Sequence, residues 1–281
     1  MQIEIIEMED DKCKFILKDS SPAMANALRR TMLQDIPKMA IDKVEFHLGP
    51  ISSDDGKEYE SMTALFDEVI AHRLGMIPVP TDYSLFTFQK DCKCGGEGCP
   101  NCTIMYSLNK TGPGMVLSGD LVPLGDAKLK VKDEFIPIVE LTDTQAVLIY
   151  ATAVMGTARQ HVKWQAAFGV GYSYLPVVEI KPAMETDSDA QQVVKLCPRH
   201  VFDIKDGKLV VIDAKKCSLC KTCMEDPIPA GAIKVHGDDH NFLFTFETDK
   251  SLTAKQVLDK ALEILAAEAK DFDDQVAALT A

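Results

Sequence analysis

The chain has 281 residues, a hydrophobic content of 46% and a formal net charge of −13. Its length exceeds one typical domain, so we expect two or three domains of ordinary globular composition. The acidic balance disfavours binding to a phosphate backbone, so we expect no direct sequence-specific contact with DNA. The longest apolar run is too short to span a bilayer, and the first residues lack a signal-peptide pattern. We therefore expect a cytoplasmic protein with no membrane partner.

Strand and helix patterns alternate in the N-terminal part of the chain. Alternating apolar residues predict two short strands over residues 1–18, joined by a turn. Ser21 and Pro22 suit the start of a helix that carries Leu28 and Met32 on its apolar face, and a strand over 39–49 follows. A second amphipathic helix is predicted between Ser61 and Gly75, on apolar residues at helical spacing: Met62, Leu65, Phe66, Val69, Ile70 and Leu74.

The pattern then changes twice along the chain. Residues 81–182 are β-rich and punctuated by Gly and Pro, and residues 183–232 form a compact unit that carries cysteines. After a strand at 240–249, one long helix is predicted from Ser251 to Leu279, with an apolar stripe that includes Leu262 and Leu265. Such a helix would span roughly 40 Å, which is longer than a small domain needs. The stripe therefore faces either the core or a partner subunit.

Eight of the nine cysteines fall into two groups, and the ninth, Cys13, is expected to be a small core residue. In a reducing compartment, clustered cysteines bind metal more often than they form disulfides. The first group can close a tetrahedron around Zn²⁺ with no position open for catalysis, so it predicts a structural zinc loop. A loop of free thiols is the alternative. The four residues are Cys92, Cys94, Cys99 and Cys102.

The second group has the spacing of an iron–sulfur motif. Two-cluster ferredoxins carry C-x2-C-x2-C-x3-C-P, whose last cysteine binds the other cluster. Here strict spacing would put the fourth cysteine at Pro227, whereas a Cys–Pro pair occurs upstream at residues 197–198. One ligand set is therefore complete: Cys197, Cys217, Cys220 and Cys223. Four thiolates suit one [4Fe–4S] cluster, and [3Fe–4S] would result if the remote cysteine does not bind. Zinc in the same ligands, or Asp226 as a labile ligand, are the alternatives.

Three further stretches carry a resemblance to a known family. The segments "NALRRTMLQDIPKMAIDKVEF" and "LFDEVIAHRLGMIPV" are similar to the two helical motifs of the α-type assembly subunits of RNA polymerase. The segment "GTARQHVKWQAAFGVGYSY" is similar to the family's H-x-K-W segment, with His161, Lys163 and Trp164 in place. Because it also carries a ferredoxin-like insertion, the chain resembles the archaeal members of this family.

The resemblance implies an α+β fold with three parts. A discontinuous α-type dimerisation domain would comprise residues 1–47 plus 236–281, an inserted β-rich domain with the zinc loop residues 48–182, and a ferredoxin-like iron–sulfur domain residues 183–235. The function implied is that of a non-catalytic assembly subunit of DNA-directed RNA polymerase, which pairs with the small α-like subunit L and docks onto the large catalytic subunits. The residues we assign to partner binding are Leu28, Met32, Leu65, Phe66, Val69, Leu262 and Leu265.

The chain has no paired catalytic carboxylates, phosphate-binding glycine loop or nucleophile motif, so we expect no catalytic residues in it.

Two other functions are compatible with parts of the sequence. The cluster motif alone would also suit a ferredoxin-type electron-transfer subunit of an oxidoreductase complex, although no flavin or nucleotide motif offers electrons a route onward. A further hypothesis is that the cluster stabilises its domain and that its oxidative loss weakens polymerase assembly.

Overall fold

The computed structural model describes residues 1–52, 56–186 and 189–280, and its secondary structure mixes helices and strands. The predicted α+β class is confirmed at this level. The chain divides into two compact units, each built from separate stretches of sequence: residues 1–8, 13–29 and 171–245, and residues 9–12, 30–170 and 246–281. The predicted ranges 48–182 and 183–235 include a few residues outside the described part, and the three domain ranges remain predictions.

The first unit contains most of a four-stranded sheet in the order β1-β2-β14-β11. Strands β1 (Gln2–Met8) and β2 (Lys12–Lys18) pair antiparallel, as the alternating pattern predicts. Strand β11 spans Ala167–Ile180, and β14 spans Ile233–Thr248. The strand predicted at 240–249 therefore begins earlier, because Ile233 and Val235 alternate with exposed residues ahead of a polar run that hid the pattern.

Aromatic side chains form the centre of this sheet. Phe15 on β2 stacks on Phe244 of β14 with ring centroids 4.9 Å apart. Tyr172 of β11 lies 5.1 Å from Phe244 and 5.6 Å from Phe242. Phe15, Phe242 and Phe244 are all fully buried. Aromatic pairs at these separations stabilise a sheet beyond the area they bury, so they join strand β2 firmly to β14 and β11.

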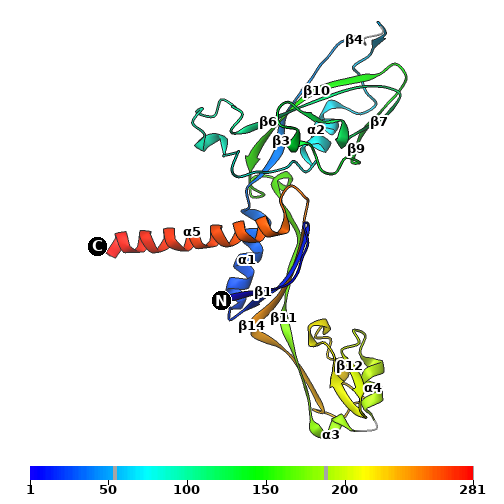
Figure 1. Cartoon of the computed structure of the whole chain (residues 1–281), viewed down its shortest axis with the longest axis vertical. Coiled ribbons are helices and arrows are strands. Elements are labelled where there is room, and N and C mark those ends of the chain that lie inside the picture. Colours follow the sequence, from blue (N-terminus) through cyan, green and yellow to red (C-terminus); the bar gives the residue numbers. More distant parts are fainter. Residues whose placement is uncertain (53–55, 187–188, 281) are drawn as a thin grey trace. The chain divides into compact units, whose positions relative to one another are not determined.

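The cysteine-bearing residues between β11 and β14 form a small group of helices and strands at the ends of these two strands (Figure 1). Their apolar side chains share one core with the adjoining ends of β11 and β14. The cysteine-bearing residues comprise α3 (Pro182–Glu185), α4 (Ala190–Leu196), and the hairpin of β12 (Phe202–Lys205) and β13 (Lys208–Val211). The hairpin turn uses Asp206 and Gly207, both with positive φ, as two-residue hairpins require. The hairpin predicted from the sequence is present, whereas a ferredoxin-like fold as such remains a prediction.

The second unit is organised by a sheet in the order β3-β10-β6-β8. Its strands are β3 (Lys38–Phe46), β10 (Ala146–Gly156), β6 (Thr103–Thr111) and the short β8 (Val122–Pro123). Two further pairs are β7 (Gly114–Leu117) with β9 (Pro137–Leu141), and β4 (Ile51–Ser52) with β5 (Glu58–Tyr59). Apolar side chains of the sheet and of helix α2 (Asp67–Gly75) share one continuous core. The β-rich character predicted for this part of the chain is thus confirmed.

Helix α2 is shorter than predicted. Met62, Leu65 and Phe66 lie before its first residue, and Phe66 has extended backbone angles at the N-cap. The hydroxyl of Thr63 donates to the carbonyl of Leu65 at 2.8 Å, a local bond that competes with helix formation. The acidic pair Asp67 and Glu68 then occupies the first turn, where the helix dipole favours negative charge.

Helices α1 (Pro22–Gln34) and α5 (Ala254–Thr280) begin close to where the sequence predicts. The hydroxyl of Ser21 accepts from the backbone N–H of Met24 at 3.3 Å, which caps α1. In α5, Thr253 and Gln256 each accept the other's backbone N–H, at 3.2 and 2.9 Å, which is a complete capping box. No helix in the described ranges is long and apolar enough to cross a membrane.

Candidate metal centres

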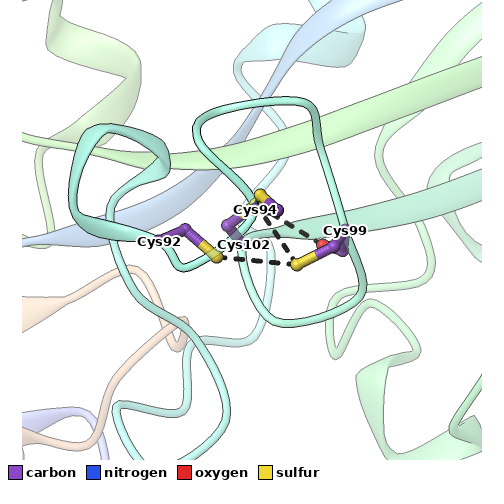
Figure 2. Close-up of side chains that lie close together, drawn as sticks. All are labelled: Cys92, Cys94, Cys99 and Cys102. Carbon is purple, nitrogen blue, oxygen red and sulfur yellow. Dashed lines mark hydrogen bonds between the residues drawn. The ribbon is translucent and has the colours of Figure 1, made fainter.

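The first cysteine group lies between the short helix η1 (Gln89–Asp91) and β6, and its four sulfur atoms all lie within 4.8 Å of one another. Figure 2 shows the thiols turned toward a common centre. The Sγ atoms of Cys92 and Cys99 are 3.5 Å apart, those of Cys94 and Cys102 3.7 Å, and those of Cys99 and Cys102 3.9 Å. Tetrahedral zinc with Zn–S bonds of about 2.3 Å requires sulfur atoms about 3.8 Å apart. The group therefore has the spacing of a tetrahedral ligand set and could hold a metal ion.

Two tight turns bring these sulfur atoms together. The backbone N–H of Gly95 donates to the carbonyl of Cys92 at 3.0 Å, and that of Cys102 donates to Cys99 at 2.9 Å. Gly95, Gly96 and Gly98 have φ values of 69°, 90° and 89°. Such angles are costly for residues with a Cβ, so the glycines let eleven residues present four thiols to one point.

The electrostatics of the group favour a bound cation. Backbone N–H groups of Cys99 and Gly98 point at the Cys94 thiol and lower its pKa to about 6. Burial raises the pKa of the Cys102 thiol to about 12. Cys94 thus favours the thiolate form even without a metal ion, whereas Cys102 needs a positive charge beside it to lose its proton. A metal ion at the centre supplies that charge.

The second group lines a small hollow. Cys197 follows α4, Cys217 follows the short helix η5 (Ala214–Lys216), and Cys223 lies in η6 (Thr222–Met224), with Cys220 between them. The structure therefore brings the remote Cys197 to the same hollow as the three clustered cysteines. Asp226, the alternative ligand, is not among the residues that line it.

Hydrogen bonds from the surrounding loop converge on the sulfur atoms of this hollow. The backbone N–H of Val201 donates to Cys197 and that of Leu219 to Cys217, both at 3.4 Å. Leu219 and Lys221 adopt left-handed angles, with φ of 57° and 64°, which lets the chain wrap around the hollow. N–H groups directed at sulfur stabilise thiolates, and such bonds also tune metal–thiolate centres.

Charge repulsion within the hollow reflects how near the four thiols lie to one another. Burial, together with the charges of Cys217, Cys197 and Cys220, raises the pKa of the Cys223 thiol to about 11. A hydrogen bond from the Thr222 side chain lowers the pKa of Cys220. Cys197 and Cys223 are buried, so four thiolates around this hollow would repel one another and would be stabilised by positive charge between them. The donor set thus fits a thiolate-bound metal centre.

The residues assigned to partner binding occupy three kinds of environment. Leu28 and Met32 are buried inside the chain itself, at 1% and 0% exposure, so they offer no surface to a partner in this conformation. Leu65, Leu262 and Leu265 are half-buried. Phe66 and Val69 are 81% and 38% exposed. An apolar stripe in a sequence identifies a face that is buried, but not whether the chain itself or a partner buries it. The sequence alone therefore could not show that Leu28 and Met32 differ from the more exposed positions.

Sequence reasoning missed the ion pairs that join distant segments. Lys38 pairs with Asp249, 211 residues away, and Lys163 pairs with Asp42, 121 residues away. No local pattern indicates such a pair, because each residue alone has the features of an ordinary surface charge. The sequence motif draws attention to the H-x-K-W segment, but not to its neighbours Asp42 and His72.

Comparison with known proteins supports the resemblance noted in the sequence. The family model described as the RNA polymerase Rpb3/Rpb11 dimerisation domain matches residues 14–269. The "DNA-directed RNA polymerase subunit Rpo3" of Thermoplasma volcanium is 41% identical over 265 residues, which cover 94% of this chain and 95% of the relative. The proteins of the same name from Archaeoglobus fulgidus and Pyrococcus furiosus are 38% and 32% identical, over 97% and 100% of this chain and 96% and 98% of their own lengths.

These matches extend over both units and both cysteine groups. The fold is thus of the Rpb3/Rpb11 dimerisation class, and the chain belongs within it to the archaeal Rpo3 family of DNA-directed RNA polymerase subunits. The family predicted from the helical motifs and the cysteine unit is confirmed.

Proposed function

We propose that this chain is a non-catalytic assembly subunit of a DNA-directed RNA polymerase, which pairs with the small α-like subunit L and docks onto the large catalytic subunits. The observation that supports the proposal is the match, over nearly the whole length, to relatives named as subunits of DNA-directed RNA polymerase. The site chemistry agrees with it. The four sulfur atoms of the first cysteine group lie close enough to bind one ion, and the other four cysteines line one hollow. A metal ion whose four positions are all filled by protein ligands has no place for a substrate.

The C-terminal half of α5 carries exposed apolar side chains that a partner subunit could cover. Its first turns are buried at Val257, Leu258 and Ala261, whereas residues 266–279 are exposed all round. Phe272 and Leu279 lie in this half at 66% and 86% exposure. Fully burying side chains of this size stabilises by about 1.5–3 kcal/mol each. We assign this stripe, with the half-buried Leu262 and Leu265 at its base, to the small subunit.

We assign structural Zn²⁺ to the first cysteine group and one iron–sulfur cluster to the second. The sulfur separations of 3.5–3.9 Å suit a single tetrahedral ion at the first. At the second, the three cysteines at two-residue gaps and the remote Cys197 suit a [4Fe–4S] cluster, with [3Fe–4S] as the form expected without Cys197. When bound, each centre supplies the positive charge that holds its thiolates and braces the loops around it.

Metal analysis and reconstitution test these assignments together. The chain is co-expressed with subunit L, purified without oxygen, and examined for iron, sulfide and zinc and by EPR. We expect about four iron, four sulfide and one zinc per chain. The change Cys102→Ser should remove the zinc alone, and Cys223→Ser the iron alone. If the wild-type chain fails to join the small and large polymerase subunits and instead accompanies a flavin or haem enzyme, the electron-transfer alternative replaces the scaffold.

Whether the second centre governs assembly is a separate question. The double change Cys217→Ser and Cys220→Ser removes two ligands of the loop, and binding of the heterodimer to the large subunits is then measured. Weaker binding supports the hypothesis that loss of the cluster hinders assembly. Unchanged binding would limit the cluster to stabilising its own residues.

A further inference from the structure

The H-x-K-W segment lines an open pocket of about 570 Å³ in the second unit. The pocket is formed by strand β3, helix α2 and the short helix η4 (Val162–Trp164), and neither metal centre contributes to it. The residues that matter for its chemistry are Asp42, His72, Gly75, Met76, His161 and Lys163. Two imidazoles, one ammonium group and one carboxylate thus line the same pocket.

Lys163 is held in a fixed position at this pocket. Its ammonium nitrogen lies 2.5 Å from the Asp42 carboxylate and 4.3 Å from the centre of the Trp164 ring, and its side chain is only 14% exposed. Trp164 is itself anchored, because its indole N–H donates to the carbonyl of Val154 at 3.1 Å. An ammonium has three N–H donors, and the ion pair with Asp42 engages one of them. The other N–H groups of the Lys163 ammonium can therefore donate to a ligand. The contact with the Trp164 ring fixes where the ammonium lies.

Strand β3 is distorted at the point where it supplies Asp42. Lys43 lies opposite Thr152 and Ile41 opposite Ala153, so Asp42 is an extra residue without a cross-strand partner. A bulge of this kind redirects one side chain away from the regular alternation of the strand. Here it coincides with the residue that holds Lys163.

The histidines add hydrogen-bond donors. The Nδ1 atom of His161 accepts from the backbone N–H of Lys163 at 3.1 Å, which caps η4. A neutral imidazole that accepts at Nδ1 carries its hydrogen on Nε2, so His161 has a donor to offer a ligand. His72 is exposed in the last turn of α2. The one carboxylate is already engaged, so the pocket has donors in excess and suits an acceptor with negative charge.

The rim of the pocket indicates that this acceptor belongs to a protein. Three exposed apolar residues lie on α2 or at its ends: Phe66 directly before the helix, Val69 within it, and Met76 directly after it, where it also lines the pocket. They are 81%, 38% and 43% exposed, and we call them the exposed stripe of α2. Adjacent exposed apolar side chains mark protein interaction surfaces, in which a few polar groups fix the register. A free anion would gain nothing from this stripe, whereas an acidic residue flanked by apolar side chains would use both features.

We propose that this pocket receives the carboxylate of an Asp or Glu side chain on a neighbouring polymerase subunit, while the exposed stripe of α2 packs against apolar residues around that side chain. The proposal rests on the assembly function given above and names the chemistry of one of its contacts. On a chain with a net charge of −13, such a pocket also provides a defined position at which an acidic partner surface is not repelled.

Two variants in the full chain test the pocket. Lys163→Met keeps the aliphatic stem and removes the ammonium, and His72→Leu removes a donor from an exposed position. The matched control is Lys43→Met, because Lys43 is on the same strand as Asp42 and pairs with Glu45 at 2.5 Å, yet is 70% exposed and outside the pocket. Thermal unfolding shows whether each variant keeps its fold.

Binding is measured in two steps, first to the small subunit and then from the heterodimer to the large subunits. Loss of a hydrogen bond to a charged group should weaken one of these steps by about 10- to 100-fold in Lys163→Met and less in His72→Leu. A charge-reversed Lys163→Glu chain should regain binding through an Asp or Glu to Lys change in the partner. If wild type assembles and both variants bind as tightly as the control in both steps, the pocket has no such role. If wild type does not assemble at all, the proposed function itself fails.

Discussion

The ion pair between Lys38 and Asp249 is buried, with side chains only 4% and 8% exposed. It joins the start of β3 to the residues that lead into α5. Lys38 also donates to the carbonyl of Gln165 at 3.3 Å, and the Asp249 carboxylate accepts from the backbone N–H of Ser251 at 3.0 Å and from its hydroxyl. These contacts fix the chain just ahead of α5 and so help to position the helix that we assign to the partner.

Removing one member of this pair should be costly. Asp249→Ala leaves the Lys38 ammonium buried without its counter-charge, and the loss of one partner from a buried pair typically costs about 3–5 kcal/mol. Replacing both residues, as in Lys38→Met with Asp249→Leu, removes the unpaired charge and should recover much of that loss. The recovery cannot be complete, since the two bonds to Ser251 stay broken.

Urea unfolding followed by the fluorescence of the single tryptophan measures the effect. Trp164 is 7% exposed and precedes Gln165, so its emission reports on the region where the pair lies. The control is Glu247→Ala, which breaks the Lys12–Glu247 pair whose side chains are 54% and 61% exposed; such pairs are worth about 0–1 kcal/mol. If Asp249→Ala destabilises no more than this control, solvent screens the pair and the reasoning is wrong.

Three further outcomes follow from single residues. Gly156→Ala would place a Cβ 2.5 Å from the Trp164 ring, so it should destabilise by about 1–3 kcal/mol and shift the tryptophan emission; an unchanged spectrum and midpoint would contradict the packing. Phe272→Asp, at a position 66% exposed, should leave the unfolding of the isolated chain unchanged but lower the yield of heterodimer with subunit L, and a normal yield would remove α5 from that interface. Burial raises the pKa of the Cys13 thiol to about 11, so iodoacetamide at pH 8 should leave it unmodified in the native chain and modify it in urea, with the native rate rising as the pH approaches that pKa; equal rates in both states at pH 8 would show that the thiol is accessible.

The parts of the fold that could be predicted from the sequence are those encoded by neighbours. The two strands over residues 1–18, the capped start of α1 at Ser21 and the start of α5 follow from alternation, helical spacing and capping residues within one or two turns of chain. The first metal group belongs to the same class, because all four of its cysteines lie within one short loop whose glycines set the turns.

Other features depend on contacts that no local pattern contains. Phe66 fits a helical stripe, yet it stands outside α2 because a side-chain bond at Thr63 and the acidic pair after it place the helix start at Asp67. Leu28 and Leu262 belong to similar stripes, but one is buried by the chain itself and the other is half exposed. Apolar periodicity reports that a face is covered, and only the packing shows by what.

The two cysteine groups differ in the length of chain between their cysteines. This length decides how much of the fold a metal bound at each group would stabilise. Cys92 and Cys102 lie at the two ends of one short loop, and the turns at its glycines are enough to bring their sulfur atoms together. Cys197 and Cys217 are brought together by the β12–β13 hairpin, which lies between them in sequence and returns the chain to the hollow. Loop closure costs more entropy as the loop lengthens, so a ligand set that spans a hairpin depends on that hairpin and in turn holds it. On the proposed assignments, loss of the metal from the first group would therefore affect one loop, whereas loss of the cluster from the second would affect the folded unit between β11 and β14.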